Sequence, residues 1–387
     1  MQHLRTLPFS LPHKGHAGHA FGPSLFLMEN SIAIALSGGV DSLFSALLLK
    51  QRGIPLFGIH FITGFEKTSP LNQGDSFPEG PGFEMENHPL KAMEETLGFP
   101  IKILDIRSEF KREVVDYFVE EYAKGRTPNP CMVCNAKIKF GTLLRRANLL
   151  GATRLATGHY AKIIADDQGR FHLFRGADPI KDQSYFLSLL NQTQLSSAIF
   201  PLENLTKKDV RRMAGEQGLN PVLSSESQDI CFIQECSYRD FLSLQPEFSS
   251  RPGSIVDRSG RQIGDHRGLH HYTVGQRRGI NIPASEPYYV IQMIPEENIL
   301  VVGHREDLLV SECRVAKMNW IGEKPRSEME AFTQVRYRHE AVPSRIIPTG
   351  EDTVTVCFRE PQAAVTPGQG AVFYDKNEVL GGGWIES

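Results

Sequence analysis

The first half of the chain alternates short apolar runs with segments whose apolar residues recur at helical spacing. The apolar runs are rich in β-forming residues, which predicts buried strands at residues 32–36, 54–62, 101–106 and 155–160. Between them, the spacing predicts one helix from Ser42 to near Gly53 and another from Ser108 to Gly125. This alternation predicts an α/β fold with a doubly wound parallel sheet, whose ligands bind at the carboxyl ends of the strands.

The pattern changes in the second half of the chain. From Val315 onward, short alternating stretches separated by Pro and Gly turns predict an antiparallel β-barrel. A chain of 387 residues is long enough for about two or three domains. We therefore predict a disordered extension at residues 1–27, the α/β domain at 28–231, a small central domain at 232–304 and the barrel at 305–387.

One turn carries a strong chemical signal: Ser37-Gly38-Gly39-Val40-Asp41-Ser42 lies between the first strand and its helix. Glycines let the backbone approach a ligand closely, and the N–H groups of the turn and helix start then form an anion site. Asp41 can cap the helix or hold a cation. No Lys follows the second glycine, so this is not the Walker pattern. An ordinary glycine-rich turn is the alternative, but it would not need the two serines and the aspartate.

Two cysteines open a later helix, in Asn129-Pro130-Cys131-Met-Val-Cys134. The prolines at 128 and 130 favour an extended loop that delivers these thiols at a helix start. A thiol there, with Lys and Arg nearby, should have a lowered pKa and be nucleophilic. A structural zinc site or buried core thiols are the alternatives. Zinc needs four ligands, and Cys231 and Cys236 lack the spacing of a second pair.

Other polar groups follow predicted strands or open predicted helices. Gly158 and His159 end the fourth strand at the ligand edge of the sheet, and Lys181-Asp182-Gln183 opens a helix. Thr206 caps a helix whose basic residues at 207–212 have the pattern of a solvated face. Cys231 follows a polar segment. These positions make a ligand site at the sheet edge the first hypothesis.

Composition limits the choice of partners. The formal net charge is −3 and the isoelectric point is about 6.5, so an RNA site must be a local basic patch. Residues 258–278 supply one, with five Arg and three His against a single acid. Arg336-Tyr337 pairs a phosphate donor with a stacking ring, which suits a splayed-out RNA base, although a generic β-domain is the alternative. No apolar run is long enough for a membrane span, and six cysteines without a secretory signal predict reduced thiols in a cytoplasm.

Together, the motifs resemble those of the tRNA-specific 2-thiouridylases, the MnmA family, which belongs to the PP-loop ATP pyrophosphatases with their HUP-like fold. The resemblance covers residues 31–386. It departs from the family pattern at Cys131, where many members carry Asp, and in the loop from Ile62 to Pro89. It rests on Ser37–Ser42, Arg126–Asn135, Thr157–Tyr160, Lys181–Leu187, Asp229–Phe232, Gly253–Asp257, Gly264–Gly268, Tyr272–Gly279, Val335–Arg338 and Ala364–Tyr374.

The resemblance implies an ATP- and Mg²⁺-dependent enzyme that thiolates the wobble uridine, position 34, in the anticodon region of tRNA. ATP adenylates the C2 oxygen and pyrophosphate leaves; sulfur from a cysteine persulfide then replaces AMP. Cys134 is implied as the nucleophile, and Cys231 as the persulfide carrier that a sulfur-relay donor protein loads. The implied ATP-binding residues are Ala35, Leu36, Ser37, Gly38, Gly39, Val40, Asp41, Ser42, Phe61 and Gly158. The implied target-base and tRNA residues are Asn129, Pro130, Cys131, His159, Lys181, Asp182, Gln183, Arg336, Tyr337 and Gln369.

Three alternatives stay open at this point. If Cys131, Cys134 and Cys231 converge, they can hold an iron–sulfur cluster that transfers sulfide instead. Another adenylating ligase would share the glycine turn but would need neither the cysteines nor the arginine-rich segment. A nucleotide-sensing RNA-binding module would bind both ligands without turnover.

Overall fold

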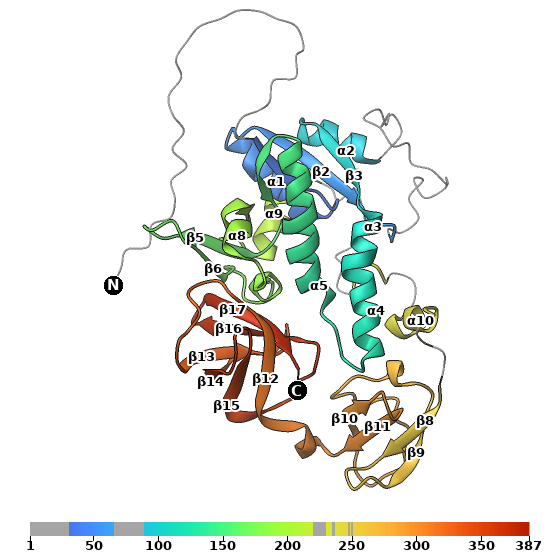
Figure 1. The fold of residues 1–387 in the computed structure, drawn as a ribbon. Helices are drawn as coiled ribbons and strands as arrows, with labels where there is room; N and C mark the ends of the chain where they lie inside the picture. Colours follow the sequence, from blue (N-terminus) through green and yellow to red (C-terminus); the bar gives the residue numbers. More distant parts are fainter. Residues whose placement is uncertain are drawn as a thin grey trace, which may run out of the picture.

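The computed structural model describes residues 31–65, 89–219, 230–233, 237–246, 248 and 251–386. The disordered extension predicted at 1–27 lies outside the described residues, as does most of the predicted loop at 62–89. Figure 1 shows the described chain as an α/β part, a small β part and a barrel.

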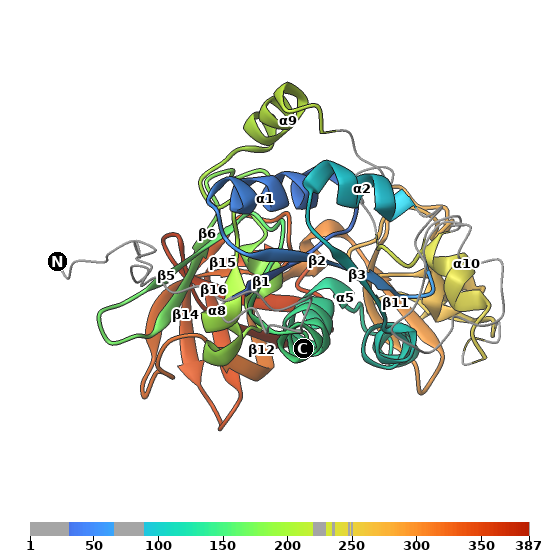
Figure 2. The same cartoon turned by 90° about the horizontal axis from the view of Figure 1, so that it is seen from above.

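The first part is built on a parallel sheet with strand order β3-β2-β1-β4-β7. In Figure 2, α1 and α2 cover one face of this sheet, and α5 lies across the other. Burial on both faces explains why the strands read as continuous apolar runs, and it confirms the predicted doubly wound fold. Its elements are β1 (Ser31–Ala35), α1 (Val40–Gln51), β2 (Leu56–Ile62), α2 (Pro89–Leu97), β3 (Ile101–Asp105), β4 (Ala152–Ala156), α8 (Gln192–Ser197), β7 (Ala198–Ile199) and α9 (Lys207–Glu216).

Two long helical rods lie beneath the sheet, each with a π-helical stretch inside it. The first rod buries Phe110, Phe118 and Tyr122 and ends at Gly125, whose φ of 67° suits glycine. A Cβ at Gly125 would lie 2.7 Å from Pro295, so this rod ends against the central domain. The rods are α3 (Arg107–Phe110), η2 (Lys111–Val115) and α4 (Asp116–Ala123), then α5 (Pro130–Val133), η3 (Cys134–Leu143) and α6 (Leu144–Leu149).

The central domain has a four-stranded sheet in the order β10-β11-β8-β9, in which only the β11–β8 pair is parallel. Its small core contains Ile255, Val290 and Leu300, all fully buried. Its elements are α10 (Tyr238–Ser243), β8 (Gly253–Val256), β9 (Gln262–His266), η4 (Leu269–His271), β10 (Tyr289–Ile294), β11 (Ile299–Gly303) and η5 (Arg305–Leu308).

The C-terminal part is a closed antiparallel barrel, as predicted. Its strands follow the order β12-β15-β14-β13-β16-β17, and β12 pairs back with β17 to close the ring. Closure leaves no free edge within the ring. The strands are β12 (Leu309–Trp320), β13 (Met329–Gln334), β14 (Val342–Pro348), β15 (Val354–Ala363), β16 (Gly370–Asp375) and β17 (Glu378–Ile385).

A hairpin from the first part joins the barrel. β5 (Ala161–Ala165) and β6 (Phe171–Arg175) form a hairpin, and β6 pairs with β17. The short helix α7 (Ser184–Leu187) follows the hairpin, and the Tyr185 hydroxyl donates to the Gly370 carbonyl oxygen at 2.9 Å. The α/β part and the barrel therefore share backbone pairing as well as side-chain contacts.

Candidate active site

A cavity of about 1080 Å³ opens at the carboxyl edge of the parallel sheet. The strand order reverses between β1 and β4, which is where ligands bind in doubly wound sheets. Sixteen of the residues that the sequence resemblance implied line this cavity: Ala35, Ser37, Gly39, Val40, Asp41, Ser42, Phe61, Asn129, Pro130, Cys131, Gly158, His159, Lys181, Gln183, Tyr337 and Gln369.

The glycine turn is held in a conformation suited to an anion. Gly38 has a φ of 78°, which strongly favours glycine, and Gly39 is the residue before the first turn of α1. The Ser42 hydroxyl donates to the Gly39 carbonyl oxygen at 2.9 Å. The start of a twelve-residue helix therefore faces the cavity with its N–H groups. Leu36 is fully buried behind the turn, and neither it nor Gly38 lines the cavity.

Gly158 lies directly against the turn. A Cβ at this position would come within 2.9 Å of the Asp41 carbonyl carbon and 3.0 Å of the Ser42 nitrogen. Backbone atoms cannot give way as a flexible side chain can. Glycine is therefore required at position 158, because the chain after β4 approaches the first turn of α1 so closely.

Asp41 is paired with a cation from α9. The Lys207 ammonium donates to both carboxylate oxygens, at 2.8 and 2.7 Å, and the Tyr160 hydroxyl donates to Oδ1 at 2.7 Å. Asp41 makes no side-chain cap for α1, and its carboxylate pairs with the Lys207 ammonium instead. Lys207 is 6% exposed, and both it and Arg211 line the cavity. The solvated-face interpretation of this helix is wrong for Lys207.

The cysteine segment is fixed from both ends. Asn129 caps α5 by accepting from the Met132 N–H at 3.3 Å, and Pro130 occupies the first helical turn. From the barrel, the Gln369 amide donates to the carbonyl oxygens of Thr127 and Pro128, at 2.9 and 3.1 Å. Gln369 thus positions the loop that leads to Cys131.

The three thiols of this region are less acidic than the sequence predicted. Burial raises the pKa of Cys134 to about 11 and that of Cys231 to about 12, and it also raises the pKa of Cys131. Lys139 opposes the shift at each thiol but does not overcome it. The predicted lowering of the pKa is wrong because burial in the protein desolvates the thiolates, even though Cys131 and Cys231 keep exposed atoms. Of the three residues, only Cys131 lines the cavity.

These thiols are electrostatic neighbours. Cys134 and Cys131 each raise the pKa of Cys231, after the larger effect of burial. Two sequence segments about a hundred residues apart are therefore brought to one place, as expected for Cys134 and Cys231. Within the part of the chain that the structure describes, no three His, Cys, Asp or Glu side chains gather as metal ligands.

Lys139 is held by a buried histidine. Its ammonium can only donate, so His159 Nε2, 3.2 Å away, is the acceptor. The proton of the neutral ring then lies on Nδ1, which donates to the Thr157 hydroxyl at 2.7 Å. Burial holds the pKa of His159 well below its ordinary value, with Lys139 adding to the effect. His159 therefore acts here as a fixed acceptor that orients a cation toward the thiols.

An aromatic wall stands beside Cys131. The rings of Phe186 and Tyr337 lie 4.2 Å apart between centroids, inclined at 40°, and both residues line the cavity. The pKa of Tyr337 is raised, first by burial, with Asp182 and Cys131 among the further causes. Tyr337 comes from the barrel and Phe186 from α7, so the wall exists only when both parts are in place.

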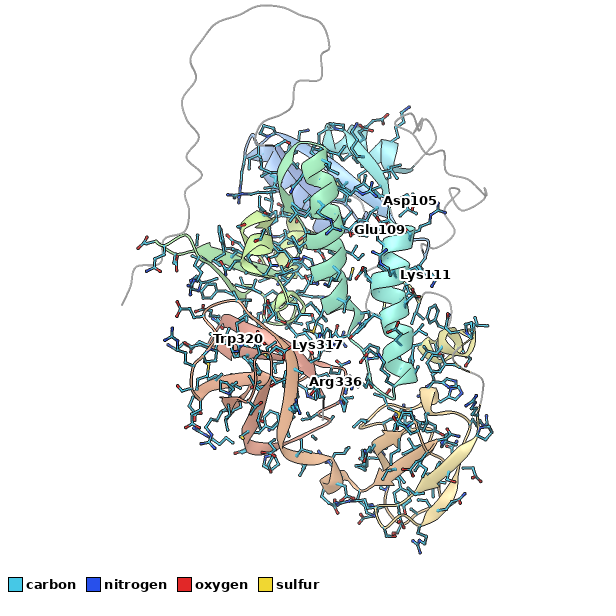
Figure 3. All side chains as sticks on the ribbon, in the orientation of Figure 1. Asp105, Glu109, Lys111, Lys317, Trp320 and Arg336 are labelled. Atoms are coloured by element: carbon cyan, nitrogen blue, oxygen red, sulfur yellow. The ribbon has the colours of Figure 1, made fainter. Side chains whose placement is uncertain are left out.

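Two residues of the implied RNA set do not reach the cavity surface. The Asp182 carboxylate is buried and accepts from Arg175 at 3.0 Å and from the Ser184 hydroxyl at 2.8 Å, so its oxygens are used inside the protein. Arg336 lies outside the lining set, on the barrel side of the space between the barrel and α4 (Figure 3). Lys181 and Gln183, which flank Asp182 in sequence, do line the cavity.

The arginine-rich segment of the central domain is only partly available. Arg258 pairs with Asp307, and Arg261 pairs with Asp257 at 3.2 Å. His266 and His270 are buried. Arg267, Arg277 and Arg278 are exposed.

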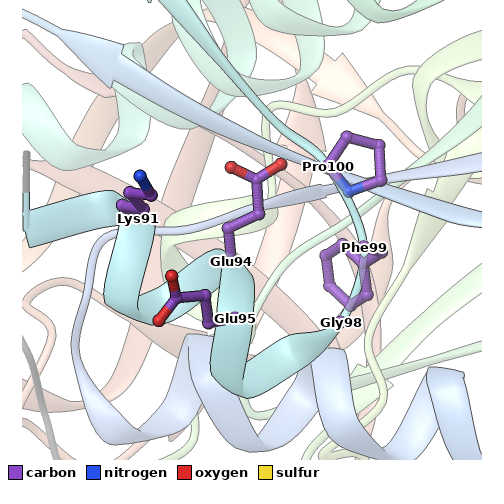
Figure 4. Close-up of a pocket in the computed structure, with 6 residues that line it drawn as sticks. All are labelled: Lys91, Glu94, Glu95, Gly98, Phe99 and Pro100. Atoms are coloured by element: carbon purple, nitrogen blue, oxygen red, sulfur yellow. The ribbon is translucent and has the colours of Figure 1, made fainter. Parts of the chain in front are cut away.

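A second, smaller hollow of about 400 Å³ lies under α2, far from the glycine turn in sequence (Figure 4). It is lined by residues with no pattern of a catalytic site: Lys91, Glu94, Glu95, Gly98, Phe99 and Pro100. The cavity at the sheet edge is therefore the candidate active site.

Comparison with known proteins agrees with this architecture. Family models described as tRNA methyl transferase HUP domain, tRNA methyl transferase PRC-barrel domain and aminomethyltransferase beta-barrel domain match residues 30–235, 239–304 and 310–385. A tRNA-specific 2-thiouridylase MnmA from Desulfosudis oleivorans is 48% identical over 356 residues, covering 92% of this chain and 95% of that protein. Its counterpart from Geobacter metallireducens is 43% identical over 362 residues, covering 92% and 96%.

The chain belongs to the tRNA-specific 2-thiouridylase family. A solved structure titled as a predicted subunit of tRNA methyltransferase from Methanocaldococcus jannaschii is 19% identical, with a TM-score of 0.30 over 48% of this chain and 75% of that one. That likeness is too low to carry an argument.

In this family member, sequence reasoning missed several residues of the site. Lys207 and Arg211 looked like a solvated face, and Phe186 was not singled out, yet all three line the cavity. Asn135 was not singled out from its neighbour Cys134. Asn135 is polar but only 3% exposed. No feature of the sequence predicts this burial, because it depends on how other parts of the chain pack around the residue.

Proposed function

We propose that this protein uses ATP to adenylate the C2 oxygen of the wobble uridine, position 34 of a tRNA, and then replaces that oxygen with sulfur. The observation that carries the proposal is that one cavity is lined both by the Ser37–Ser42 turn and by the Asn129–Cys131 segment. An anion site and a cysteine thus face the same space. The name of the relatives, tRNA-specific 2-thiouridylase, supports the same chemistry.

The chemistry of the cavity favours thiolation over the methyl transfer that the family-model descriptions mention. A glycine turn at a helix start binds phosphate, which methyl transfer does not require. The neighbouring cysteines supply groups that carry sulfur. We therefore interpret the site as one for adenylation followed by sulfur transfer.

In the first step, ATP lies with its phosphates on the turn. The N–H groups of the turn and of α1, with Lys207, meet the charge that develops on the transferring phosphate. Mg²⁺ is usually held by one or two carboxylates together with substrate phosphates, so Asp41 fits as its protein ligand. When bound, the ion neutralises phosphate charge.

The adenylation step exchanges one bond for another at phosphorus. The uridine O2–P bond forms, the bond from the α-phosphate to the leaving pyrophosphate breaks, and N3 releases its proton to water. The base must be splayed out of the anticodon loop to reach the α-phosphate. Phe186 and Tyr337 offer an aromatic surface for it beside Cys131.

The sulfur step uses Cys231 and Cys134. A persulfide donor protein loads Cys231, the terminal sulfur attacks C2, and AMP leaves with the former O2. Cys134 then attacks the Cys231 sulfur, which breaks the persulfide bond, leaves 2-thiouridine and joins the two cysteines in a disulfide. A thiol reductant restores both thiols. The described cysteines are free thiols, which supports a reducing compartment such as the cytoplasm.

The iron–sulfur alternative predicts a different protein. As placed, the three thiols do not form a metal ligand set among the described residues, so we derive no step through a cluster. Protein purified without oxygen should be colourless, and Cys131→Asp should remain active. About four irons per chain, lost together with activity in Cys131→Ser, would favour the cluster.

The deciding experiment measures pyrophosphate release and 2-thiouridine separately. Pyrophosphate release should depend on tRNA, which separates this enzyme from a ligase with another substrate and from a binding module without turnover. Cys134→Ser and Cys231→Ser should release pyrophosphate but form no 2-thiouridine, because neither thiol acts before the adenylated base exists. Normal 2-thiouridine in either variant contradicts the sulfur roles, and Cys357→Ser serves as the matched thiol control in the barrel.

A further inference from the structure

A buried polar network joins the two parts of the chain that carry the aromatic wall of Phe186 and Tyr337. Its members are Asp182, Arg175 and Gln334, and none of these three lines the cavity. Asp182 is 6% exposed and Gln334 is 4% exposed. The network therefore lies inside the protein, although the sequence resemblance implied Asp182 as a contact to tRNA.

Both carboxylate oxygens of Asp182 are occupied. Oδ1 accepts from the backbone N–H groups of Gly176 and Ser184, at 3.0 and 3.2 Å. Oδ2 accepts from the Ser184 hydroxyl at 2.8 Å and from Arg175 Nη1 at 3.0 Å. These bonds hold the start of α7, the helix that carries Phe186, against the end of β6.

Arg175 continues the network into the barrel. Its Nη2 donates to Gln334 Oε1 at 3.2 Å, and its guanidinium carbon lies 3.8 Å from the centroid of the Tyr374 ring. The Gln334 amide nitrogen donates to the carbonyl oxygens of Arg336 and Tyr337, at 3.2 and 2.6 Å. The turn that presents Tyr337 is therefore tied, through Arg175, to the α/β part.

The chemistry of the partners fixes the direction of each bond. A guanidinium only donates and a carbonyl oxygen only accepts, so the Gln334 amide fits between them in one orientation. The planar guanidinium of Arg175 serves two acceptors at once, one from each part of the chain. A buried network whose groups are satisfied in this way makes the structure rigid and specifies one arrangement of it.

We propose that Arg175 and Gln334 are positioning residues, which hold the Tyr337 ring against Phe186 so that the wall receives the target base in one place. The inference rests on the proposed function, because it assumes that the splayed-out uracil stacks on this wall. Asp182 then serves tRNA modification by anchoring Arg175 rather than by touching the RNA. The position of the base matters because a misplacement of about 1 Å costs about 100-fold in rate.

The first test measures pyrophosphate release by the full-length protein against the concentration of a tRNA transcript with uridine at position 34. Arg175→Met removes the link between Asp182 and Gln334. We expect kcat to fall about 10- to 100-fold while KM for tRNA changes less than about twofold, because phosphate contacts elsewhere supply most of the affinity. A kcat within about twofold of that of the unaltered protein overturns the inference.

A second variant guards against misfolding. Arg175→Met leaves the buried Asp182 carboxylate without its cation, which is strongly destabilising. Asp182→Asn combined with Arg175→Met avoids the unpaired charge but still lacks the link to Gln334. Thermal unfolding checks that this double variant is folded, and its kcat should fall as in Arg175→Met. A folded double variant with the kcat of the unaltered protein overturns the inference.

The matched control lies on the same strand. His172 of β6 bonds Glu378 of β17 at 2.6 Å, so it also joins the hairpin to the barrel, but it does not line the cavity. His172→Gln should keep kcat within about twofold of that of the unaltered protein. An equal loss of kcat in His172→Gln would mean that any weakening of this joint slows the reaction, and the positioning role would be wrong.

A double-mutant cycle asks whether Gln334 acts through Tyr337. Tyr337→Leu alone should lower kcat about tenfold, and adding Gln334→Met should lower it further by less than about twofold, because the ring that Gln334 positions is gone. Fully additive losses overturn the inference. If no tRNA stimulates pyrophosphate release in the unaltered protein, the proposed function fails; if tRNA does so but the Arg175 and Gln334 variants keep their kcat, only the inference fails.

Discussion

Single residues matter most where two backbones nearly touch. Gly158 is such a position, because any Cβ there meets the backbone of Asp41 and Ser42. The sequence shows a Gly-His pair after a strand, but the distance of 2.9 Å gives the reason for the glycine.

Gly158→Ala should therefore push the glycine turn out of place. We expect the variant to bind ATP about tenfold more weakly and to lose about 1–3 kcal/mol of unfolding free energy, as overpacked sites do. Nucleotide titration and urea unfolding measure the two effects. Gly322→Ala is the control, since nothing lies within 4 Å of its Cβ position. Unchanged ATP affinity in Gly158→Ala would contradict the assignment.

At the scale of elements, the ion pair of Lys207 and Asp41 ties α9 to α1. Lys207→Met leaves the Asp41 carboxylate without its cation. Because the Asp41 side chain is 32% exposed, we expect the free energy of unfolding to fall by about 1–3 kcal/mol, less than the full cost of an unpaired buried charge. Asp41→Asn combined with Lys207→Met should cost less than the sum of the two, by about 1 kcal/mol. Urea unfolding of the four proteins gives this coupling.

The control lies on the outer face of the same helix. Arg212 pairs with Glu216 at 2.8 Å, but their side chains are 58% and 56% exposed. Arg212→Met should change stability by less than about 0.5 kcal/mol. A Lys207→Met variant as stable as Arg212→Met would show that the pair does not hold the two helices together.

A second pair of elements, the β5–β6 hairpin and β17, is joined by a histidine. His172 hydrogen-bonds Glu378 at 2.6 Å and Asp166 at 3.2 Å. Burial lowers the pKa of His172, but its bonds and charge attraction to these carboxylates outweigh burial and raise it overall. A raised pKa in the folded protein gives stability that is complete below the unfolded pKa of about 6.5 and is lost as pH rises through the folded value.

His172→Gln should therefore lower the melting temperature more at pH of about 5.5 than at pH of about 9. Thermal unfolding of both proteins at the two pH values measures the difference. His339→Gln is a control of opposite sign, because burial, with Arg336 adding to it, lowers the pKa of His339. If the loss of melting temperature in His172→Gln does not become smaller as pH rises, the pairing of a charged His172 with Glu378 and Asp166 is ruled out.

At the scale of the whole molecule, the basic residues left exposed on the central domain are the candidate phosphate contacts. Arg277 and Arg278 are exposed, whereas Arg258 is paired with Asp307. Replacing Arg277 and Arg278 with Ala should weaken tRNA binding and reduce the slope of log affinity against log salt by about one to two. Arg345→Ala, which removes a paired arginine from the barrel, is the control. An unchanged slope would mean that neither arginine contacts phosphate.

The length and polarity of the helices are also features of this scale. No helix among the described residues is long and apolar enough to cross a bilayer. The longest rods bury their apolar faces against the sheet, the hairpin and the central domain instead.

The sequence by itself determined the elements and the order of the motifs. Apolar periodicity is local, so strands such as β1 and β2, the rod that ends at Gly125 and the barrel were all predicted correctly. The turn at Ser37–Ser42 and the placement of Cys131 and Cys134 at a helix start also depend on local chemistry alone. These features hold because backbone preferences act over a few residues.

Only the tertiary structure decided what surrounds each side chain. Whether a lysine is solvated or paired, as for Lys207, depends on an element more than 150 residues away, and the thiol of Cys134 is made less acidic by walls that come from several segments. Asp182, Arg175 and Gln334 likewise come together only in the folded chain. Desolvation and long-range pairing depend on packing, and packing is a property of the folded chain rather than of any stretch of sequence.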